Sequence, residues 1–388
     1  MKKSSTRIET QLIHAGEASP RISGAVSMPI FQSSTFEYGG EASYHDVRYI
    51  RLNNTPNHLA LHQKLAAVEG AEAALVAASG MAAISTSLLT ILSKGDHLLA
   101  QNCLYGGTHD FVTKDLPRLG IEHTFIDLDQ PQTWKQHLRP TTRAIYVEAI
   151  TNPLVQVGDL EATVAFAREH DLVSMIDSTF ATPINYKPCA HGFDLVLHSC
   201  TKYMNGHSDI VAGAVIGSSK LVDAVKHRLD HFGGALDPHA CYLLHRGMKT
   251  LAVRMAYQNR SALEIARFLG KHKAVKRVNY PGLESHPNHA RARKLFTGFS
   301  GMLSFELNGS VAEADRFMAK TTLPICAPSL GGPETLITRP ATTSHAGLTP
   351  DERRRLGISD SLIRMSVGLE STEDLIADFD QALASVGA

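Results

Sequence analysis

Residues 144–147 read Ala-Ile-Tyr-Val, residues 159–168 read Asp-Leu-Glu-Ala-Thr-Val-Ala-Phe-Ala-Arg, and residues 173–176 read Val-Ser-Met-Ile. The first and third stretches are short apolar runs that suit buried strands. The middle stretch opens with Asp159, an N-cap candidate, and carries the apolar stripe of an amphipathic helix. The three stretches together predict a strand, a crossover helix and a second strand, which is the repeating unit of an α/β protein.

The same rhythm extends in both directions from this unit. Further short apolar runs lie at 74–77, 97–100, 124–126 and 195–197. Buried strands that alternate with amphipathic helices predict a mostly parallel sheet with helices on both faces. Ligands of such sheets bind beyond the carboxyl ends of the strands. Functional side chains are therefore expected directly after the apolar runs.

Three segments can be separated along the chain. Residues 1–55 lack steady periodicity and are expected to form an extended arm, whereas helical spacing begins near Leu61. Residues 56–250 carry the strand–helix rhythm. After 250, a long helical pattern at 251–268 is followed by an alternating strand pattern at 301–307. We therefore expect a large domain at 56–250 and a smaller C-terminal α/β domain at 251–388.

Composition excludes several classes of partner and compartment. The 388 residues contain 38 Lys plus Arg and 38 Asp plus Glu, so the formal net charge is zero. A nucleic acid or an anionic membrane surface would require a basic excess, and neither is expected as a partner. Five scattered Cys without a CxxC motif favour a reducing compartment, and the cytoplasm is predicted. The longest uncharged run, 73–93, is rich in Ser and Thr, which favours a buried strand–turn–helix over a membrane span.

A carboxylate and a lysine follow two consecutive predicted strands. Asp177 comes directly after the run 173–176, and Lys202 follows the run 195–197 by a few residues. Both should emerge at the same edge of the sheet. A lysine enclosed at such an edge can form an imine with a carbonyl compound. The alternative is a lysine that extends to solvent and an aspartate that caps a helix.

An anion site is expected next to this lysine. Ser79-Gly80 follows the run 74–77 and opens a helix, whose free amides favour an anion. Ser199 and Thr201 are spaced so that their hydroxyls can point the same way. An ordinary strand–helix turn is the alternative for Ser79-Gly80. A lysine, an acid and a phosphate site together are the parts of a pyridoxal 5'-phosphate (PLP) site.

Several motifs, in order along the chain, resemble those of one known family. They are Ser79-Gly80-Met81-Ala82-Ala83, Tyr105-Gly106-Gly107-Thr108, Leu197–Asp209 around Lys202, Ser329-Leu330-Gly331-Gly332 and Leu362–Glu370. The chain resembles the PLP-dependent enzymes of cysteine and methionine metabolism from about Thr10 to its C-terminus. That family includes cystathionine γ-lyase, γ-synthase and β-lyase, methionine γ-lyase and the homoserine-ester sulfhydrylases. The resemblance implies fold type I, the aspartate-aminotransferase-like fold of PLP-dependent transferases.

The resemblance also implies roles for individual residues. Lys202 would bind the cofactor covalently and later move the substrate's α-proton. Asp177 would face the pyridine nitrogen, and Tyr105 would stack over the ring and exchange protons. Asn152 would lie near the ring hydroxyl and the substrate. The residues that the resemblance assigns to the cofactor phosphate are Gly80, Met81, Ser199 and Thr201.

Substrate binding and assembly follow from the same resemblance. Arg364 looks like the clamp for the amino-acid carboxylate, and Ser329 would lie beside it. Tyr49 and Arg51 look like the pair that reaches the phosphate of the neighbouring subunit, in a tetramer built from two active dimers. The segment that follows, residues 52–57, reorders the Asn, Pro and Thr that the family shows nearby.

The predicted activity is a carbon–sulfur lyase of transsulfuration, which acts by α,γ- or α,β-elimination on cystathionine or a related thioether amino acid. Gly107 stands where methionine γ-lyases usually have Cys, and Pro328 stands where cystathionine γ-lyases and γ-synthases often have Glu. The alternative within the family is a γ-replacement enzyme, such as cystathionine γ-synthase or O-acylhomoserine sulfhydrylase.

Two alternatives lie outside the family's chemistry. One is a lysine–imine aldolase without a cofactor, and the other is a non-catalytic binding protein with a degenerate enzyme fold. No metal ligand is expected. His286 and His289 are the nearest pair of histidines along the chain. Pro287 and the lack of nearby Cys or acidic partners disfavour a metal site there, so both are predicted to be surface loop residues.

Overall fold

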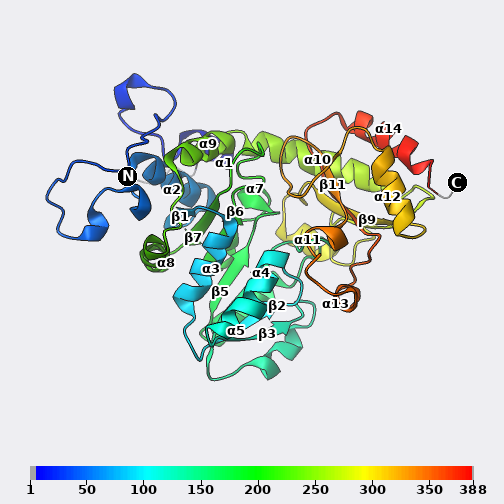
Figure 1. Ribbon diagram of the computed structural model, residues 1–388, viewed down its shortest axis with the longest axis horizontal. Coiled ribbons are helices and arrows are strands. Elements are labelled where there is room, and N and C mark those ends of the chain that lie inside the picture. The colour runs from blue at the N-terminus through cyan, green and yellow to red at the C-terminus, as the bar shows by residue number, and fades with distance from the viewer. Residues whose placement is uncertain (1–5, 387–388) are drawn as a thin grey trace.

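The computed structural model describes residues 6–386 and contains two β-sheets. In Figure 1 the larger sheet lies toward the left and centre, and the smaller one lies toward the right, next to the long helix α10 (Leu251–Leu269). The seven-stranded sheet has the order β1-β7-β6-β5-β4-β2-β3, and the five-stranded sheet has the order β10-β11-β12-β9-β8. The helices within the described residues are α1 (Ile8–His14), α2 (Pro56–Glu69), α3 (Gly80–Ile91), α4 (Gly106–Asp110), α5 (Leu116–Arg118), α6 (Leu160–Glu169), α7 (Thr182–Asn185), α8 (Ser219–Phe232), α9 (Pro238–Met248), α10, α11 (His289–Leu295), α12 (Val311–Lys320), α13 (Pro350–Arg355) and α14 (Thr372–Leu383).

The large sheet is parallel except at one strand. Strands β3, β2, β4, β5 and β6 run parallel to one another, and β7 pairs antiparallel with both β6 and β1. All six apolar runs expected to be strands are strands. The strands are β1 (Ala73–Ala77), β2 (His97–Gln101), β3 (Glu122–Ile126), β4 (Thr142–Glu148), β5 (Val173–Asp177), β6 (Leu195–Ser199) and β7 (Gly213–Gly217).

Two hydrophobic clusters cover the two faces of this sheet. Successive side chains of a strand point to opposite faces, so Val76 of β1 packs in one cluster and Leu75 in the other. The first cluster includes Leu61 of α2 and Leu160 of α6, whereas the second includes residues of α3 and α8. Helices therefore cover both faces, as predicted, and the strand ends are left free to carry polar side chains.

The second sheet is mostly antiparallel and has a core of its own. Helices α10, α12 and α14 pack on it through Ile265, Phe317 and Phe379. The predicted helix at 251–268 corresponds to α10, and the predicted strand at 301–307 corresponds to β9. The strands are β8 (Val275–Asn279), β9 (Met302–Leu307), β10 (Ile325–Cys326), β11 (Leu336–Thr338) and β12 (Ile363–Ser366). The smaller C-terminal α/β unit is thus present, while the domain boundaries at 55 and 250 stay a prediction.

The N-terminal segment differs from a purely extended arm. Residues 8–14 form helix α1, and its Leu12 is fully buried in the first cluster. The remainder loops out at one end of the molecule, at the left of Figure 1, and contains short 3-10 turns. These turns are η1 (Ile22–Gly24), η2 (Tyr44–Asp46) and η3 (Ile50–Leu52). No helix within residues 6–386 is long and apolar enough to cross a bilayer.

Candidate functional site

A cavity of about 590 Å³ lies at the carboxyl ends of β4, β5 and β6, between the two sheets. This is the place where an open α/β sheet holds its ligand. Two of the twelve predicted site residues, Tyr49 and Arg51, lie elsewhere. The ten that line the cavity are Gly80, Met81, Tyr105, Asn152, Asp177, Ser199, Thr201, Lys202, Ser329 and Arg364.

Lys202 lies three residues beyond the end of β6 and points into this cavity. Its Nζ donates a hydrogen bond to Ser329 Oγ at 2.8 Å. Burial lowers the pKa of Lys202 to about 8, and the positive charge of Arg364 adds to this shift. Ser329 has a φ of +89°, in the left-handed region that costs a residue with a side chain energy. This strained backbone holds the serine hydroxyl next to an amine that loses its proton more readily than an ordinary lysine does.

Asp177 is the last residue of β5, as predicted from its position after the apolar run. One carboxylate oxygen accepts the backbone N–H of Thr179 at 2.9 Å. Burial raises the pKa of Asp177, and the hydrogen bonds from Thr179 and the nearby His198 oppose that rise only in part. A carboxylate in this position is stabilised by a cationic group beside it.

A second carboxylate, Glu148, lines the same cavity and was missed by the sequence analysis. It ends β4 and pairs in register with Asp177 of β5. Burial and the neighbouring Asp177 raise the pKa of Glu148 well above its ordinary value. Its Oε1 accepts the backbone N–H of Tyr105 at 2.6 Å. The signal was available, because Glu148 follows an apolar run just as Asp177 does.

The predicted anion cradle forms where α3 begins against the end of β6. The Ser79 hydroxyl caps α3 by accepting the N–H of Ala82 at 3.0 Å. A Cβ added to Gly80 would lie only 2.8 Å from Ser199 Cβ. Only glycine therefore allows the helix start to approach Ser199 this closely. The free amides of a helix N-terminus attract an anion, and the Ser199 and Thr201 side chains flank the same part of the cavity.

Arg364 comes from β12 of the second sheet and is buried. One Nη donates to the Ser329 carbonyl at 2.9 Å and the other to Asn152 Oδ1 at 3.3 Å. Within residues 6–386, no acceptor lies within hydrogen-bond distance of its Nε. Burial lowers the pKa of Arg364 to about 10, which still leaves it charged at neutral pH. A buried guanidinium with an unused donor fits a carboxylate ligand.

Two positions that bear on the substrate lie at the cavity. A Cβ added to Gly107 would lie 2.7 Å from Tyr105 Cε1 and 3.2 Å from Met81 Sδ, so any side chain there would press on the tyrosine ring. Pro328 lines the cavity wall, and the only carboxylates that line the cavity among the described residues are Glu148 and Asp177. The wall at 328 therefore offers no charge to a distal ammonium group.

Tyr49 and Arg51 lie on the N-terminal segment and do not contribute to the cavity of their own chain. Arg51 instead donates to the Asp230 carbonyl at 2.7 Å and to the Tyr44 hydroxyl at 2.5 Å. The reordered segment 52–57 contacts an earlier part of the N-terminal segment. Its Asn57 side chain bonds the N–H of residue 31 and the carbonyl of residue 29, both at 2.8 Å.

The prediction that His286 lies on the surface is wrong. Its side chain is buried, and burial lowers its pKa to about 4. Its Nδ1 accepts the backbone N–H of Asn288 at 3.1 Å, so the imidazole serves to order the turn before α11. His289 Nδ1 bonds the Pro281 carbonyl at 2.8 Å. Pro287 indicates a surface loop and is exposed, but its neighbours His286 and Asn288 are buried.

Comparison with known proteins identifies the family to which this set of cavity residues belongs. The family model described as Cys/Met metabolism PLP-dependent enzyme matches residues 9–384. The chain belongs to this family. It is therefore a PLP-dependent enzyme that acts on amino acids, and the resemblance noted in the sequence is confirmed. Neither a cofactor-free aldolase nor a non-catalytic binding protein is supported.

Three relatives of this PLP-dependent enzyme cover at least 97% of its length. Cystathionine beta-lyase MetC of Bacillus subtilis (strain 168) is 40% identical over 100% of this chain and 98% of its own. L-methionine gamma-lyase of Fusobacterium nucleatum subsp. polymorphum is 41% identical over 97% and 98%. The crystal structure of cystathionine gamma-lyase from Lactobacillus plantarum, complexed with L-serine, is 37% identical and matches 98% of this chain and 99% of that chain at a TM-score of 0.93. The predicted fold type I is thereby confirmed.

The residues of the cavity fit PLP. The enclosed lysine can form an imine, the carboxylate of Asp177 can stabilise a protonated ring nitrogen, and the glycine-framed start of α3 can receive a phosphate. Ser329, with its left-handed backbone, and the free donor on Arg364 belong to the part of the lining that the C-terminal segment contributes, where the amino-acid substrate would bind.

Proposed function

We propose that this enzyme is a carbon–sulfur lyase that acts on cystathionine or a related thioether amino acid by α,γ- or α,β-elimination. The products are a thiol, a 2-oxo acid and ammonia. One observation carries the proposal: an amine with a lowered pKa and a buried guanidinium face the same cavity. The names of the relatives agree with it, since they are lyases for sulfur amino acids. When bound, the cofactor supplies an electron sink for charge that develops on the substrate's α-carbon.

Arg364 binds the α-carboxylate of the substrate. Its planar guanidinium presents parallel donors to the two carboxylate oxygens, a geometry that a lysine ammonium does not provide. Asn152 and the Ser329 carbonyl hold the guanidinium in place by accepting from its two Nη groups. The substrate's α-carbon is thereby held on the side of the cavity that Lys202 faces.

Lys202 moves the α-proton at its Nζ. A pKa near 8 lets the amine accept a proton near neutral pH and still release it in the same cycle. Ser329 Oγ, at 2.8 Å, orients this amine. Tyr105 is the second proton carrier, because its ring lines the cavity and Glu148 fixes its backbone.

The remaining residues hold the cofactor. Asp177 would keep the ring nitrogen protonated, Tyr105 would stack on the ring, and Asn152 would lie near the ring hydroxyl. The start of α3 and two hydroxyls at the end of β6 would hold the phosphate. The residues in this last group are Gly80, Met81, Ser199 and Thr201.

Tyr49 and Arg51 complete the phosphate site of a neighbouring subunit, in a tetramer of two active dimers. Their position outside the cavity of their own chain supports this proposal. The N-terminal segment also exposes large apolar side chains, including Val26 and Tyr38 at 75% and 67%, and such side chains mark an interaction surface. The five cysteines are free, which supports a cytoplasmic location.

A product assay tests the reaction. The holoenzyme is incubated separately with cystathionine, methionine, cysteine, and O-acylhomoserine plus a thiol, and Lys202→Ala is the control. Pyruvate from cystathionine indicates β-cleavage, and 2-oxobutyrate indicates γ-cleavage. Either 2-oxo acid, released with a thiol and lost in the control, is the expected result. Net formation of a thioether without a 2-oxo acid would contradict the proposal and identify a γ-replacement enzyme.

A further inference from the structure

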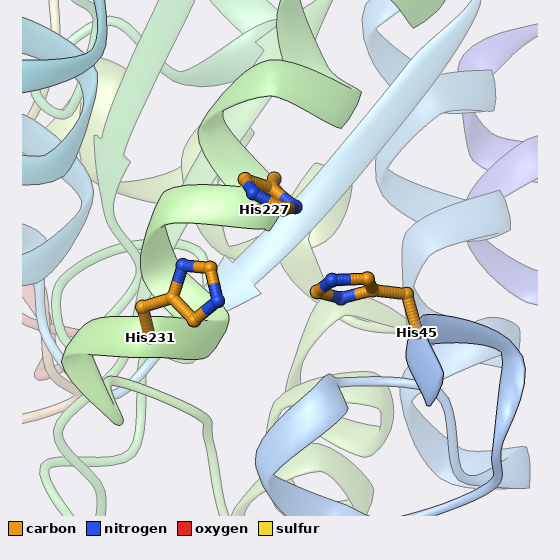
Figure 2. Close-up of side chains that lie close together, drawn as sticks. All are labelled: His45, His227 and His231. Atoms are coloured by element: carbon orange, nitrogen blue, oxygen red, sulfur yellow. The ribbon is translucent and has the colours of Figure 1, made fainter. Parts of the chain in front are cut away.

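Three histidines from two distant segments meet on the surface, away from the catalytic cavity. Figure 2 shows His45 facing His227 and His231 across a short gap. His227 and His231 are one helical turn apart on α8, so they share a face of that helix. His45 belongs to the 3-10 turn η2 of the N-terminal segment. The ring centroid of His227 lies 4.7 Å from each of the other two, and the third pair is 5.8 Å apart.

The ring nitrogens are placed for a shared ligand. One nitrogen from each histidine lies within 4.8 Å of the other two. Zinc–imidazole bonds of about 2.0–2.1 Å in a tetrahedral site put ligand nitrogens about 3.4 Å apart, so small rotations of the rings close the set. His227 and His231 are exposed and have room for such rotations. Three imidazoles with one open position suit Zn²⁺, Ni²⁺ or Cu²⁺, because imidazole is a preferred ligand of these ions.

The surrounding charges favour a cation. A cavity of about 500 Å³ beside His45 and His227 is lined by three carboxylates, Asp46, Asp223 and Asp230, and by two bases. Lys226, one of these bases, binds the Asp230 carboxylate at 2.7 Å. Within residues 6–386, Asp46 and Asp223 make no ion pair with a basic side chain, so their charge is left to attract an ion.

We propose that His45, His227 and His231 bind one transition-metal ion of the zinc and nickel class, and that this ion clamps the N-terminal segment onto α8. The site departs from the expectation that the protein has no metal ligand, because His45 meets the two histidines of α8 only in the folded chain. The clamp would act six residues before Arg51, which itself bonds the backbone of α8 at Asp230. The metal therefore fixes the part of the segment that carries Tyr49 and Arg51.

Metal binding is measured on the tag-free holoenzyme after treatment with a chelator. Zinc chloride and nickel chloride are titrated by calorimetry, and the triple variant His45→Gln, His227→Gln, His231→Gln gives the background from thiols and cofactor. We expect one site per chain that is absent in the triple variant and at least about tenfold weaker in each single variant. His14→Gln, an exposed histidine on α1, is the matched control and should leave affinity unchanged. Equal binding by the wild type and the triple variant would overturn the proposal.

A second measurement tests the clamp apart from binding. Trypsin cleaves after exposed arginines, and Arg48 is exposed three residues after His45. Zinc should slow cleavage at Arg48 in the wild type and in His14→Gln, and should have no effect in the triple variant. Equal thermal melting of the metal-free proteins shows that all variants are folded. Binding of zinc without any protection at Arg48 would overturn the clamp.

Discussion

Lys202 owes its chemistry to its surroundings. An amine with an ordinary pKa is almost fully protonated at neutral pH and is a poor nucleophile. Burial, with a contribution from Arg364, brings the pKa of Lys202 down to about 8. Burial in the cavity and the nearby Arg364 therefore make the amine of Lys202 more reactive.

The reactivity of Lys202 should follow this pKa. In the apoenzyme, the initial rate at which pyridoxal phosphate and borohydride label Lys202 should rise as the pH approaches about 8 and level off above it, because only the neutral amine attacks. Peptide mass spectrometry of samples quenched at short times measures the rate. In Arg364→Gln the midpoint should move to higher pH, since a positive charge that lowers the pKa is removed. A pH-independent rate would contradict the assignment.

Glu148 is expected to act as a hydrogen-bond acceptor rather than as a charge. Burial and the neighbouring Asp177 raise its pKa well above the ordinary value, which favours its neutral form, while its Oε1 accepts the Tyr105 N–H. Glu148→Gln keeps an acceptor of the same shape and should change kcat by no more than about threefold, whereas Glu148→Ala leaves the N–H unpaired and should lower kcat about tenfold or more.

Steady-state kinetics of the two Glu148 variants tests this prediction. The cofactor content of each variant is measured by absorbance. A large loss in both variants would mean that the negative charge itself is required. Equal, full activity in both would mean that the contact to Tyr105 has no catalytic consequence.

Residues at strand ends could be predicted because each follows a visible apolar run. Asp177 was found in this way, and Glu148 could have been found by the same rule. The strain at Ser329 and the free Nε of Arg364 could not, because they depend on contacts between the two sheets. The role of Arg364 therefore came from family resemblance alone.

At the scale of elements, the proposed phosphate site forms where the start of α3 packs against the end of β6. Gly80 starts the helix, and its missing Cβ leaves room for Ser199. Gly213 of β7 serves a similar purpose beside it, since a Cβ there would lie 2.1 Å from the Ser79 carbonyl oxygen. Three backbone segments thus approach one another more closely than side chains would allow.

Gly80→Ala should weaken cofactor retention. The new methyl group would lie 2.8 Å from Ser199 Cβ, so the start of α3 must move away from β6. We expect pyridoxal phosphate to dissociate at least about tenfold more readily, a cost typical of overpacking at a close contact. Equilibrium dialysis measures it. Gly270→Ala, where the Cβ would come only within 3.2 Å of one backbone oxygen and φ is not left-handed, is the control and should bind as the wild type does.

Sequence periodicity predicted the elements that pack in regular layers. All six apolar runs became strands, and 251–268 became α10. Strand β7 was missed because its five residues begin and end with glycine, a composition that indicates a turn. Helix α1 was missed because seven residues are too few to show a period, and it is the packing of Leu12 into the core that stabilises it.

At the scale of the whole molecule, the residues proposed for the catalytic site fall on two separate surfaces of one chain. Lys202 lies in the cavity, and Arg51 lies on the N-terminal segment against α8. If the N-terminal segment serves a neighbouring subunit, a single chain does not form a complete active site by itself.

A mixing experiment tests this arrangement. Lys202→Ala and Arg51→Ala should each be nearly inactive as purified. When they are co-expressed with different tags and the hybrid is isolated, one site in each hybrid dimer pairs an intact lysine with an intact arginine. The isolated hybrid dimer should therefore regain about half of wild-type activity, and an unsorted random mixture about a quarter. A mixture that stays as inactive as its parents would show that both residues serve the same chain.

The contact of Arg364 with Asn152 joins the small sheet to the end of β4. The groups proposed for the coenzyme lie on the large sheet, on the helices and loops that follow its strands, and on the N-terminal segment, whereas the guanidinium proposed for the substrate carboxylate belongs to the small sheet. Residues before 250 thus carry the coenzyme contacts, and the C-terminal part adds Arg364 and Pro328 to the substrate side of the cavity. Exchange of the C-terminal part between relatives of different specificity should therefore change the substrate preference, while the visible absorbance of bound pyridoxal phosphate is kept.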